Sequence, residues 1–232
     1  MNPAQFNIAQ YLSVLPLFSS LSSKQLQGLE VGCTIHSFAR GASIFVAGEV
    51  CQAFYVVVTG KVKLYVATPT GQEKVIELIE PSNSFAEGFM FLGCPYRVSA
   101  QTLSDSLLLR VSKEVVEFEI KRDPQLAMSM LAGISRRLHG LIRDVEGYTL
   151  HSGMQRLIGY LLRDAESQLP NGTEGPLTVV LTASKATIAS RLSLTPEYFS
   201  RVLHELEDAG LIKLCKREIQ ILDLKRLIAF SL

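Results

Sequence analysis

Closely spaced cysteines are absent from this sequence, and with them the usual ligand patterns of zinc and iron–sulfur sites. The four cysteines, Cys33, Cys51, Cys94 and Cys215, lie far apart, and no two of them form a C-x-x-C pair. Because such sites normally draw their ligands from close pairs, we expect reduced thiols and no bound metal. The four histidines are scattered as well, and no H-E-x-x-H spacing occurs.

Long apolar runs and a strong charge of one sign are also missing. No apolar run approaches the roughly 20 residues that a membrane-spanning helix needs. The first residues lack the basic and apolar regions of a secretory signal, so we expect a cytoplasmic protein with no membrane partner. The 23 lysines and arginines balance 22 acidic residues. Any binding to nucleic acid must therefore depend on local placement of charge.

Catalytic motifs form the third absence. The sequence contains no P-loop, nucleophile elbow, Ser/His/Asp set or paired-carboxylate motif. We therefore predict that the protein is not an enzyme.

A regular apolar repeat is present between Pro124 and His151. Its members alternate at spacings of four and three: Ala127, Leu131, Ile134, Leu138, Leu141, Val145 and Tyr148. This is a heptad seam, and a helix of this length measures about 40 Å. A stripe this narrow favours a homodimer formed by a two-stranded coiled coil. The alternative is a long core helix within one domain.

The residues before this seam are typical of a β-rich domain. Short β-forming runs alternate with glycines: Ser43–Val46, Phe54–Thr59, Lys61–Ala67, Lys74–Ile79 and Val98–Arg110. Pro69-Thr70-Gly71-Gln72 has the composition of a hairpin turn. Strands at this spacing predict a sandwich or jelly roll. We expect helix within residues 6–31 and again over residues 113–121, which connect to the seam.

The residues after the seam predict a winged helix-turn-helix. Ser184 can cap a short helix, and Thr195-Pro196-Glu197 has the residue order that begins a second one. Gly210 ends this second helix, and two short strands, Leu211–Leu214 and Glu218–Leu222, follow it. Helix, turn, helix and β-hairpin in this order are typical of DNA-binding proteins.

One face of the second helix has the chemistry needed to read base edges. Glu197, Ser200 and Arg201 have i, i+3, i+4 spacing, so they share a face. Glutamate can accept a hydrogen bond from cytosine, and arginine can donate two to guanine. The full candidate DNA-binding set is Thr195, Glu197, Tyr198, Ser200, Arg201, Lys185, Lys213, Lys216 and Arg217, the last three on the wing near phosphates. The alternative is a solvated polar face on a protein-interaction module.

Both halves resemble the CRP/FNR family of bacterial transcription regulators. The likeness rests on Phe38-Ala-Arg-Gly41, Phe54-Tyr-Val-Val-Val-Thr-Gly60, Phe85-Ala-Glu87 and the stretch Ile188–Ile212. It implies an α+β fold with a β-roll sensor domain (1–122), a dimerisation helix (123–151) and a winged helix-turn-helix (152–232). Ser193 departs from the glycine that is usual in the family's helix-turn-helix turn.

The resemblance also implies partners. The E-x-x-S-R arrangement of Glu197, Ser200 and Arg201 looks like the FNR-type reading head. The expected target is palindromic double-stranded DNA with TTGAT-like half-sites, and RNA polymerase is an expected partner. Residues 71–75 and 83–91 are similar to the Dnr-type regulators of denitrification, which are taken to sense nitric oxide through haem at low oxygen. Whether the protein activates or represses stays open.

Three effectors can be compared. For cAMP, Ala86 replaces a glycine, and Cys94-Pro95 stand where the family has Arg-Ser, with Arg97 three positions later. An FNR-type iron–sulfur cluster needs cysteines nearer the N-terminus than Cys33. We therefore expect neither, and haem, another small molecule or no effector remain. The candidate pocket residues are Glu87, Phe89, Phe91, Arg97, Met130 and His139, with His139 the candidate haem ligand.

Overall fold

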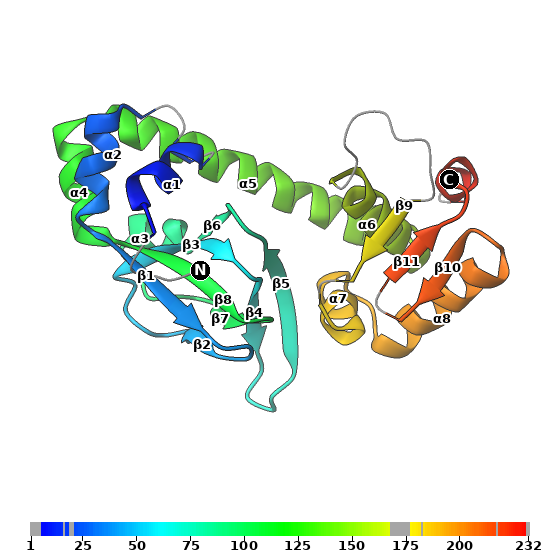
Figure 1. The fold of residues 1–232 in the computed structure, drawn as a ribbon. Coiled ribbons are helices and arrows are strands. Elements are labelled where there is room, and N and C mark those ends of the chain that lie inside the picture. Colours follow the sequence, from blue (N-terminus) through cyan, green and yellow to red (C-terminus); the bar gives the residue numbers. More distant parts are fainter. Residues whose placement is uncertain are drawn as a thin grey trace. The chain divides into compact units, whose positions relative to one another are not determined.

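The computed structural model describes residues 6–15, 17–18, 21–167, 177–181, 183–216 and 218–230, without the side chains of residues 143, 147–149, 164, 166 and 167. The chain divides into two compact units, 1–140 and 141–232. The division falls inside one continuous helix, α5 (Gln125–Leu150), whose first part packs with the first unit (Figure 1).

The first unit is a jelly roll of two four-stranded antiparallel sheets. One sheet has the order β1-β8-β3-β6 and the other β2-β7-β4-β5. The strands are β1 (Cys33–Phe38), β2 (Ser43–Phe45), β3 (Ala53–Thr59), β4 (Val62–Ala67), β5 (Glu73–Ile79), β6 (Ser84–Phe85), β7 (Ser99–Thr102) and β8 (Ser106–Ser112). The predicted β-roll is thus confirmed.

Apolar side chains from both sheets fill the space between them. Phe54, Phe85 and Leu108 are fully buried there, and Phe45 stacks on Tyr96 with 3.8 Å between ring centroids. The predicted turn over residues 69–72 is confirmed and joins β4 to β5. Its Gly71 has a φ of +84°, which glycine adopts without a steric penalty.

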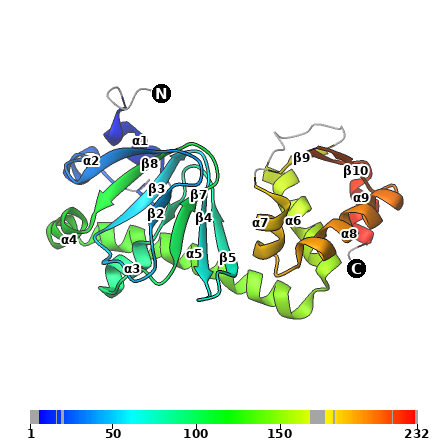
Figure 2. The same ribbon diagram turned by 90° about the horizontal axis from the view of Figure 1, so that it is seen from below.

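Helices close the ends of the jelly roll. They are α1 (Ile8–Val14), α2 (Ser23–Glu30), α3 (Glu87–Leu92) and α4 (Lys113–Arg122). Figure 2 shows α2 beside α4 at one end of the sheets. Ser22 and Gln25 form a capping box at the start of α2.

The structure confirms helix within residues 6–31, where α1 and α2 lie, and corrects one predicted strand. Val98–Arg110 forms two strands separated by a turn at residues 103–105. Strand β1 was not predicted, because Thr34, His36 and Ser37 give it a largely exposed, polar pattern. It is paired along its whole length with β8, which supplies the order that its own sequence lacks.

The second unit is a winged helix-turn-helix, as predicted. Its elements are α6 (Gly153–Ser167), β9 (Leu177–Val180), α7 (Lys185–Arg191), α8 (Pro196–Asp208), β10 (Ile212–Cys215), β11 (Glu218–Ile221) and α9 (Leu224–Ala229). The strands form an antiparallel sheet in the order β10-β11-β9. Leu161, Ile188, Phe199 and Leu203 form part of a separate apolar core. Helix α9 was not predicted.

Helix α5 carries the heptad seam. Leu126 and Met130 at its start are buried in the core of the first unit. Further along, Leu131, Leu138 and Val145 are more than half exposed. Among the described residues, no helix is long and apolar enough to cross a membrane.

Candidate nucleic-acid interface and effector site

Helix α8 begins at a well-formed cap. Thr195 is the N-cap, and its Oγ1 accepts a hydrogen bond from the backbone N–H of Tyr198 at 3.2 Å. Pro196 takes the first helical position, where its missing N–H has no helical partner to lose. Phe199, Val202 and Leu203 anchor the helix in the core. The opposite face is therefore held in a fixed orientation toward solvent.

That solvent face presents the residues predicted to read DNA. Glu197 and Arg201 are exposed, and Ser200 and Tyr198 are half-buried. The Arg201 guanidinium carbon lies 4.8 Å from the centroid of the Tyr198 ring, within the range of a cation–π contact. The ring restricts the arginine while leaving its N–H donors available. The structure therefore brings Glu197, Ser200 and Arg201 together on one side of α8.

The turn between α7 and α8 is held by a contact from α6 that the sequence did not reveal. Ser193 has a φ of +56°, in the left-handed region. The Arg156 guanidinium of α6 donates to the carbonyls of Leu192 at 2.6 Å and Ser193 at 3.3 Å. Arg156 thus satisfies carbonyls at the end of α7 and helps fix the turn that orients α8. The position of Arg156 among the apolar residues of α6 was the signal in the sequence that could have indicated this role.

The candidate phosphate contacts surround this helix pair. Lys185 is the first residue of α7, Lys213 lies on β10, and Lys216 lies at the wing turn with a φ of +54°. All three are exposed. Arg217 lies outside the described residues. Exposed lysines on separate elements are suited to phosphate contacts rather than to base reading.

In the first unit, the turn from β6 into α3 holds a buried carboxylate. Ala86 precedes α3 with a φ of +74°, and the next residue, Glu87, is only 4% exposed. The Ser84 hydroxyl donates to Glu87 Oε1 at 3.0 Å. A carboxylate buried this deeply needs charged or hydrogen-bonding partners.

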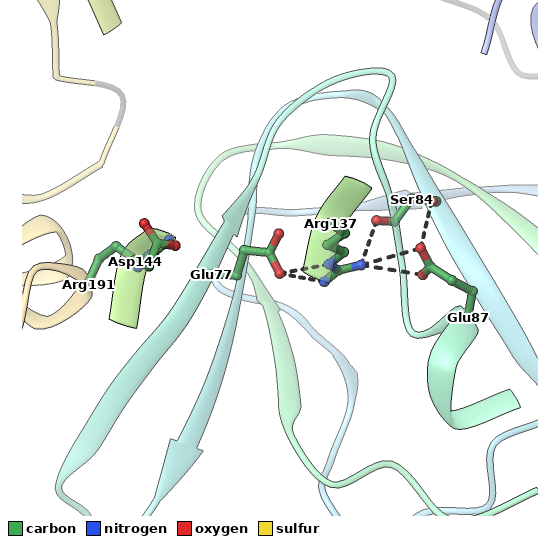
Figure 3. A network of polar contacts seen from close by, with 6 residues as sticks. All are labelled: Glu77, Ser84, Glu87, Arg137, Asp144 and Arg191. Atoms are coloured by element: carbon green, nitrogen blue, oxygen red, sulfur yellow. Dashed lines mark hydrogen bonds and ion pairs between the residues drawn. The ribbon is translucent and has the colours of Figure 1, made fainter. Parts of the chain in front are cut away.

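Arg137 of α5 supplies the positive charge (Figure 3). Its Nη1 lies 3.4 Å from Glu87 Oε2 and donates to the Ser84 carbonyl at 3.0 Å. Its Nε and Nη2 donate to Glu77 Oε2 on β5 at 3.0 and 2.5 Å. One guanidinium therefore joins α5 to three elements of the jelly roll. We call Arg137, Glu77, Glu87 and Ser84 the Arg137 cluster; the sequence indicated only Glu87.

The other predicted effector-pocket residues are not all brought together. Phe89 packs against the core, where its ring meets that of Tyr96, and Met130 is fully buried. Phe91, Arg97 and His139 are exposed. Of the predicted set, only Glu87, Phe89 and Met130 are buried or half-buried in the first unit.

A second ion pair lies within the second unit. Asp144, near the end of α5, pairs with Arg191 in the last turn of α7. Its other oxygen lies 3.4 Å from Arg163 of α6. The Asp144 side chain is 11% exposed and that of Arg191 is 16% exposed. We call Asp144, Arg191 and Arg163 the Asp144 cluster.

The cysteines do not form a metal site in the part of the chain that the structure describes, where no group of three potential ligands occurs. All four are free thiols. Burial, with a smaller contribution from nearby Glu30, raises the pKa of Cys33 to about 12. A thiol in this state is a poor nucleophile and a poor metal ligand at neutral pH.

Two family descriptions match the two halves of the chain. Residues 35–123 match the cyclic nucleotide-binding domain, and residues 155–230 match the Crp-like helix-turn-helix domain. The first range covers most of the jelly roll and the second covers the capped α8 face.

Full-length relatives agree with this division. The chain is 38% identical to DNR from Pseudomonas aeruginosa, whose crystal structure it matches over 97% of this chain and 99% of that one with a TM-score of 0.53. It is 27% identical over 219 residues to the cyclic AMP receptor protein of Thermus thermophilus, covering 94% of this chain and 98% of the relative. The structure of FixK2 from Bradyrhizobium japonicum, at 23% identity, shares the fold with a TM-score of 0.75 over 86% of this chain and 98% of that one.

Proposed function

Because the chain belongs to the CRP/FNR family of transcription regulators, we propose that two copies pair along α5 and read a palindromic DNA site with their α8 helices. The chain is a DNA-binding regulator with an effector-type β-roll, and its relatives are regulators rather than enzymes. Pairing, half-site sequence, effector and contact with RNA polymerase are our proposals. The observation that supports sequence-specific reading is the exposed polar face of α8, and the observation that supports pairing is the exposed apolar stripe on α5.

The apolar stripe supports pairing with a second copy. Leu131, Leu138 and Val145 are 54%, 57% and 60% exposed and recur every seven residues. Ala127, Ile134 and Leu141 are half-buried between them. Apolar side chains repeated in this way are stabilised when a second helix covers them. Two-fold pairing would also explain a palindromic target, since each α8 would enter one half-site about 34 Å from the other.

The face of α8 supports sequence-specific reading. Arg201 is exposed and can donate to guanine O6 and N7, and the exposed Glu197 can accept a hydrogen bond from cytosine N4. By resemblance to FNR-type regulators, TTGAT-like half-sites are the proposed target. Lys185, Lys213 and Lys216 would hold the phosphates on either side.

A binding experiment tests this function. The full-length chain is titrated onto a labelled TTGAT palindrome and onto a scrambled duplex, and Kd is measured by fluorescence anisotropy. We expect preference for the palindrome, and Arg201→Ala should cost about 1–3 kcal/mol on the palindrome only. Lys225→Ala, an exposed residue of α9, serves as the control. Equal affinity for both duplexes would instead favour a protein-interaction module.

The β-roll is proposed to take a small effector beside α5. Haem is the specific candidate suggested by the likeness to Dnr-type regulators, but the described residues do not fit it well. Haem needs an axial ligand, and His36, His139, His151 and His204 are all exposed. The Arg137 cluster also links α5 to the turn before α3. A small polar effector near Glu87 therefore agrees better with these residues.

Cyclic AMP is not favoured either. Glu87, on the turn where the family binds the cyclic phosphate, is paired with Arg137, and Arg97 is exposed. Absorption spectra after haem titration and calorimetry with cAMP test both exclusions. We expect no shifted Soret band and no binding heat. A Soret band that moves with nitric oxide would restore the haem proposal.

A further inference from the structure

A glycine occupies the first position of helix α6, although its backbone conformation does not require one. The φ of Gly153 lies outside the left-handed region that favours glycine. The helix start is fixed by Ser152, whose Oγ accepts from the Gln155 N–H at 3.2 Å and whose N–H donates to Gln155 Oε1 at 2.7 Å. Because glycine is a weaker helix former than alanine, the reason for Gly153 lies in what surrounds it.

The neighbours of Gly153 leave no room for a side chain. A Cβ atom added there would lie 2.4 Å from Cε1 and 3.0 Å from Cζ of Tyr198 on α8, and 2.9 Å from Cδ2 of Leu194. These separations are well below the roughly 3.5–4.0 Å at which carbon atoms pack. The Tyr198 ring therefore rests on the backbone of α6 with Leu194 beside it. We call Gly153 and Leu194 the Tyr198 seat.

The ring that rests on this seat is also held from within α8. The Tyr198 N–H donates to Thr195 Oγ1, and the half-buried ring packs against the core of the second unit. Arg201 follows at i+3, where two side chains of a helix are neighbours. Its guanidinium carbon lies 4.8 Å from the ring centroid. An exposed arginine is thus placed over a ring that the seat and the core hold still.

This arrangement affects how an arginine reads guanine. Two parallel hydrogen bonds to O6 and N7 require one particular orientation of the planar guanidinium. A long exposed side chain loses rotamer freedom when it adopts that orientation. The Tyr198 ring limits the conformations of Arg201 before DNA is bound, so less freedom is lost on binding.

We propose that Tyr198 is a positioning residue for guanine recognition. Its ring, supported by the Tyr198 seat, holds the Arg201 guanidinium in the orientation that reads the guanine of each half-site. This inference rests on the proposed function of the protein as a specific DNA reader. It assigns specificity to a ring that does not itself need to touch a base.

Replacing the ring in the full-length protein tests the proposal. Kd is measured by fluorescence anisotropy on the TTGAT palindrome, on the same palindrome with 7-deazaguanine, which lacks the N7 acceptor, and on scrambled DNA. Loss of a cation–π contact should cost about 2- to 5-fold per half-site, so Tyr198→Leu should weaken palindrome binding by about 5- to 30-fold. The ratio of the 7-deazaguanine Kd to the guanine Kd should fall toward one.

Tyr198→Phe is the conservative variant. It keeps the ring and removes only the hydroxyl, so it should retain the guanine ratio of the wild-type protein. In an Arg201→Ala background, Tyr198→Leu should have little further effect on palindrome Kd, because the ring acts through the arginine.

The seat offers a second route and a matched control. Gly153→Ala forces the ring away from α6 without removing it, and should lower the guanine ratio in the same direction as Tyr198→Leu. Gly159 lies on the same helix, where an added Cβ would meet nothing within 4 Å. Gly159→Ala should therefore leave palindrome Kd within about twofold. Thermal unfolding identifies any variant that does not fold, and the other substitution then gives the result.

The two proposals fail in different ways. Wild-type protein that binds the palindrome and scrambled DNA equally would contradict the DNA-reading function itself. Specific wild-type binding with an unchanged guanine ratio in Tyr198→Leu, or with effects that multiply with those of Arg201→Ala, would overturn the positioning role alone. Loss of the ratio in Tyr198→Phe would assign the effect to the hydroxyl and overturn it as well.

Discussion

Ser193 shows how a single residue can fit a turn and still carry a conformational cost. Its φ of +56° is disfavoured for residues with a Cβ atom, and glycine is usual here in related regulators. Arg156 compensates by donating to both carbonyls of the turn. The departure from glycine that the sequence revealed therefore leaves the helix-turn-helix intact.

Replacing this serine provides a stability prediction. Ser193→Gly should stabilise the second unit by roughly 0.5 kcal/mol, because relief of the left-handed conformation slightly exceeds the added entropy of the unfolded chain. Urea unfolding followed by circular dichroism would measure it. Ser193→Ala retains the Cβ atom and should not stabilise; a lower stability for the glycine variant would contradict the argument.

Cys33 provides a prediction about pH. Its folded pKa is raised from 9.0 to about 12, mainly by burial, and its thiol donates to the Leu29 carbonyl. Because the unfolded thiol ionises first, the contribution of Cys33 to stability is complete below pH 9 and declines as pH rises toward 12. The free energy of unfolding should fall over this range, and less steeply in Cys33→Ala. Equal slopes in both proteins would refute this assignment.

At the scale of elements, α5 combines a buried beginning with an exposed apolar stripe. Leu138→Glu should prevent pairing while leaving each unit folded, since Leu138 is already 57% exposed in the single chain. Analytical ultracentrifugation should show monomers, with an unchanged circular dichroism spectrum. Arg136→Glu introduces the same glutamate side chain, with a larger change of charge, at an exposed position off the seam and should remain dimeric. A dimeric Leu138→Glu protein would place the interface elsewhere.

Elements with strong local signals were predictable from the sequence. The heptad seam, the Thr195-Pro196 start of α8 and the turn around Gly71 each depend on neighbouring residues alone, and each is confirmed as local structure. Helix α3 lacks such signals, since Ala86 provides no side-chain cap and both ends have positive φ. Its position depends on tertiary packing.

The two candidate sites also differ in how far the sequence alone predicts them. The reading face of α8 follows from helical spacing and was predicted. The Arg137 cluster joins residues that are 50 to 60 positions apart in sequence, so no local pattern indicates it.

At the scale of the whole molecule, affinity for DNA must depend on a few exposed cations, because the net charge is only +1. Lys213→Gln combined with Lys216→Gln removes two proposed phosphate contacts per chain, or about four per dimer. The slope of log K against log salt should therefore become shallower by roughly 3 to 4. The ratio of palindrome to scrambled affinity should change little. Loss of that ratio with an unchanged slope would show that these lysines do not act on phosphates.

The uncovered stripe on α5 also has a consequence for gene dosage. If only paired chains occupy the operator, the amount of active regulator rises with the square of its concentration whenever monomers predominate. Halving synthesis would then lower the dimer population to about one quarter. Promoters served by such a regulator would respond sharply to its own expression level, before any effector is present.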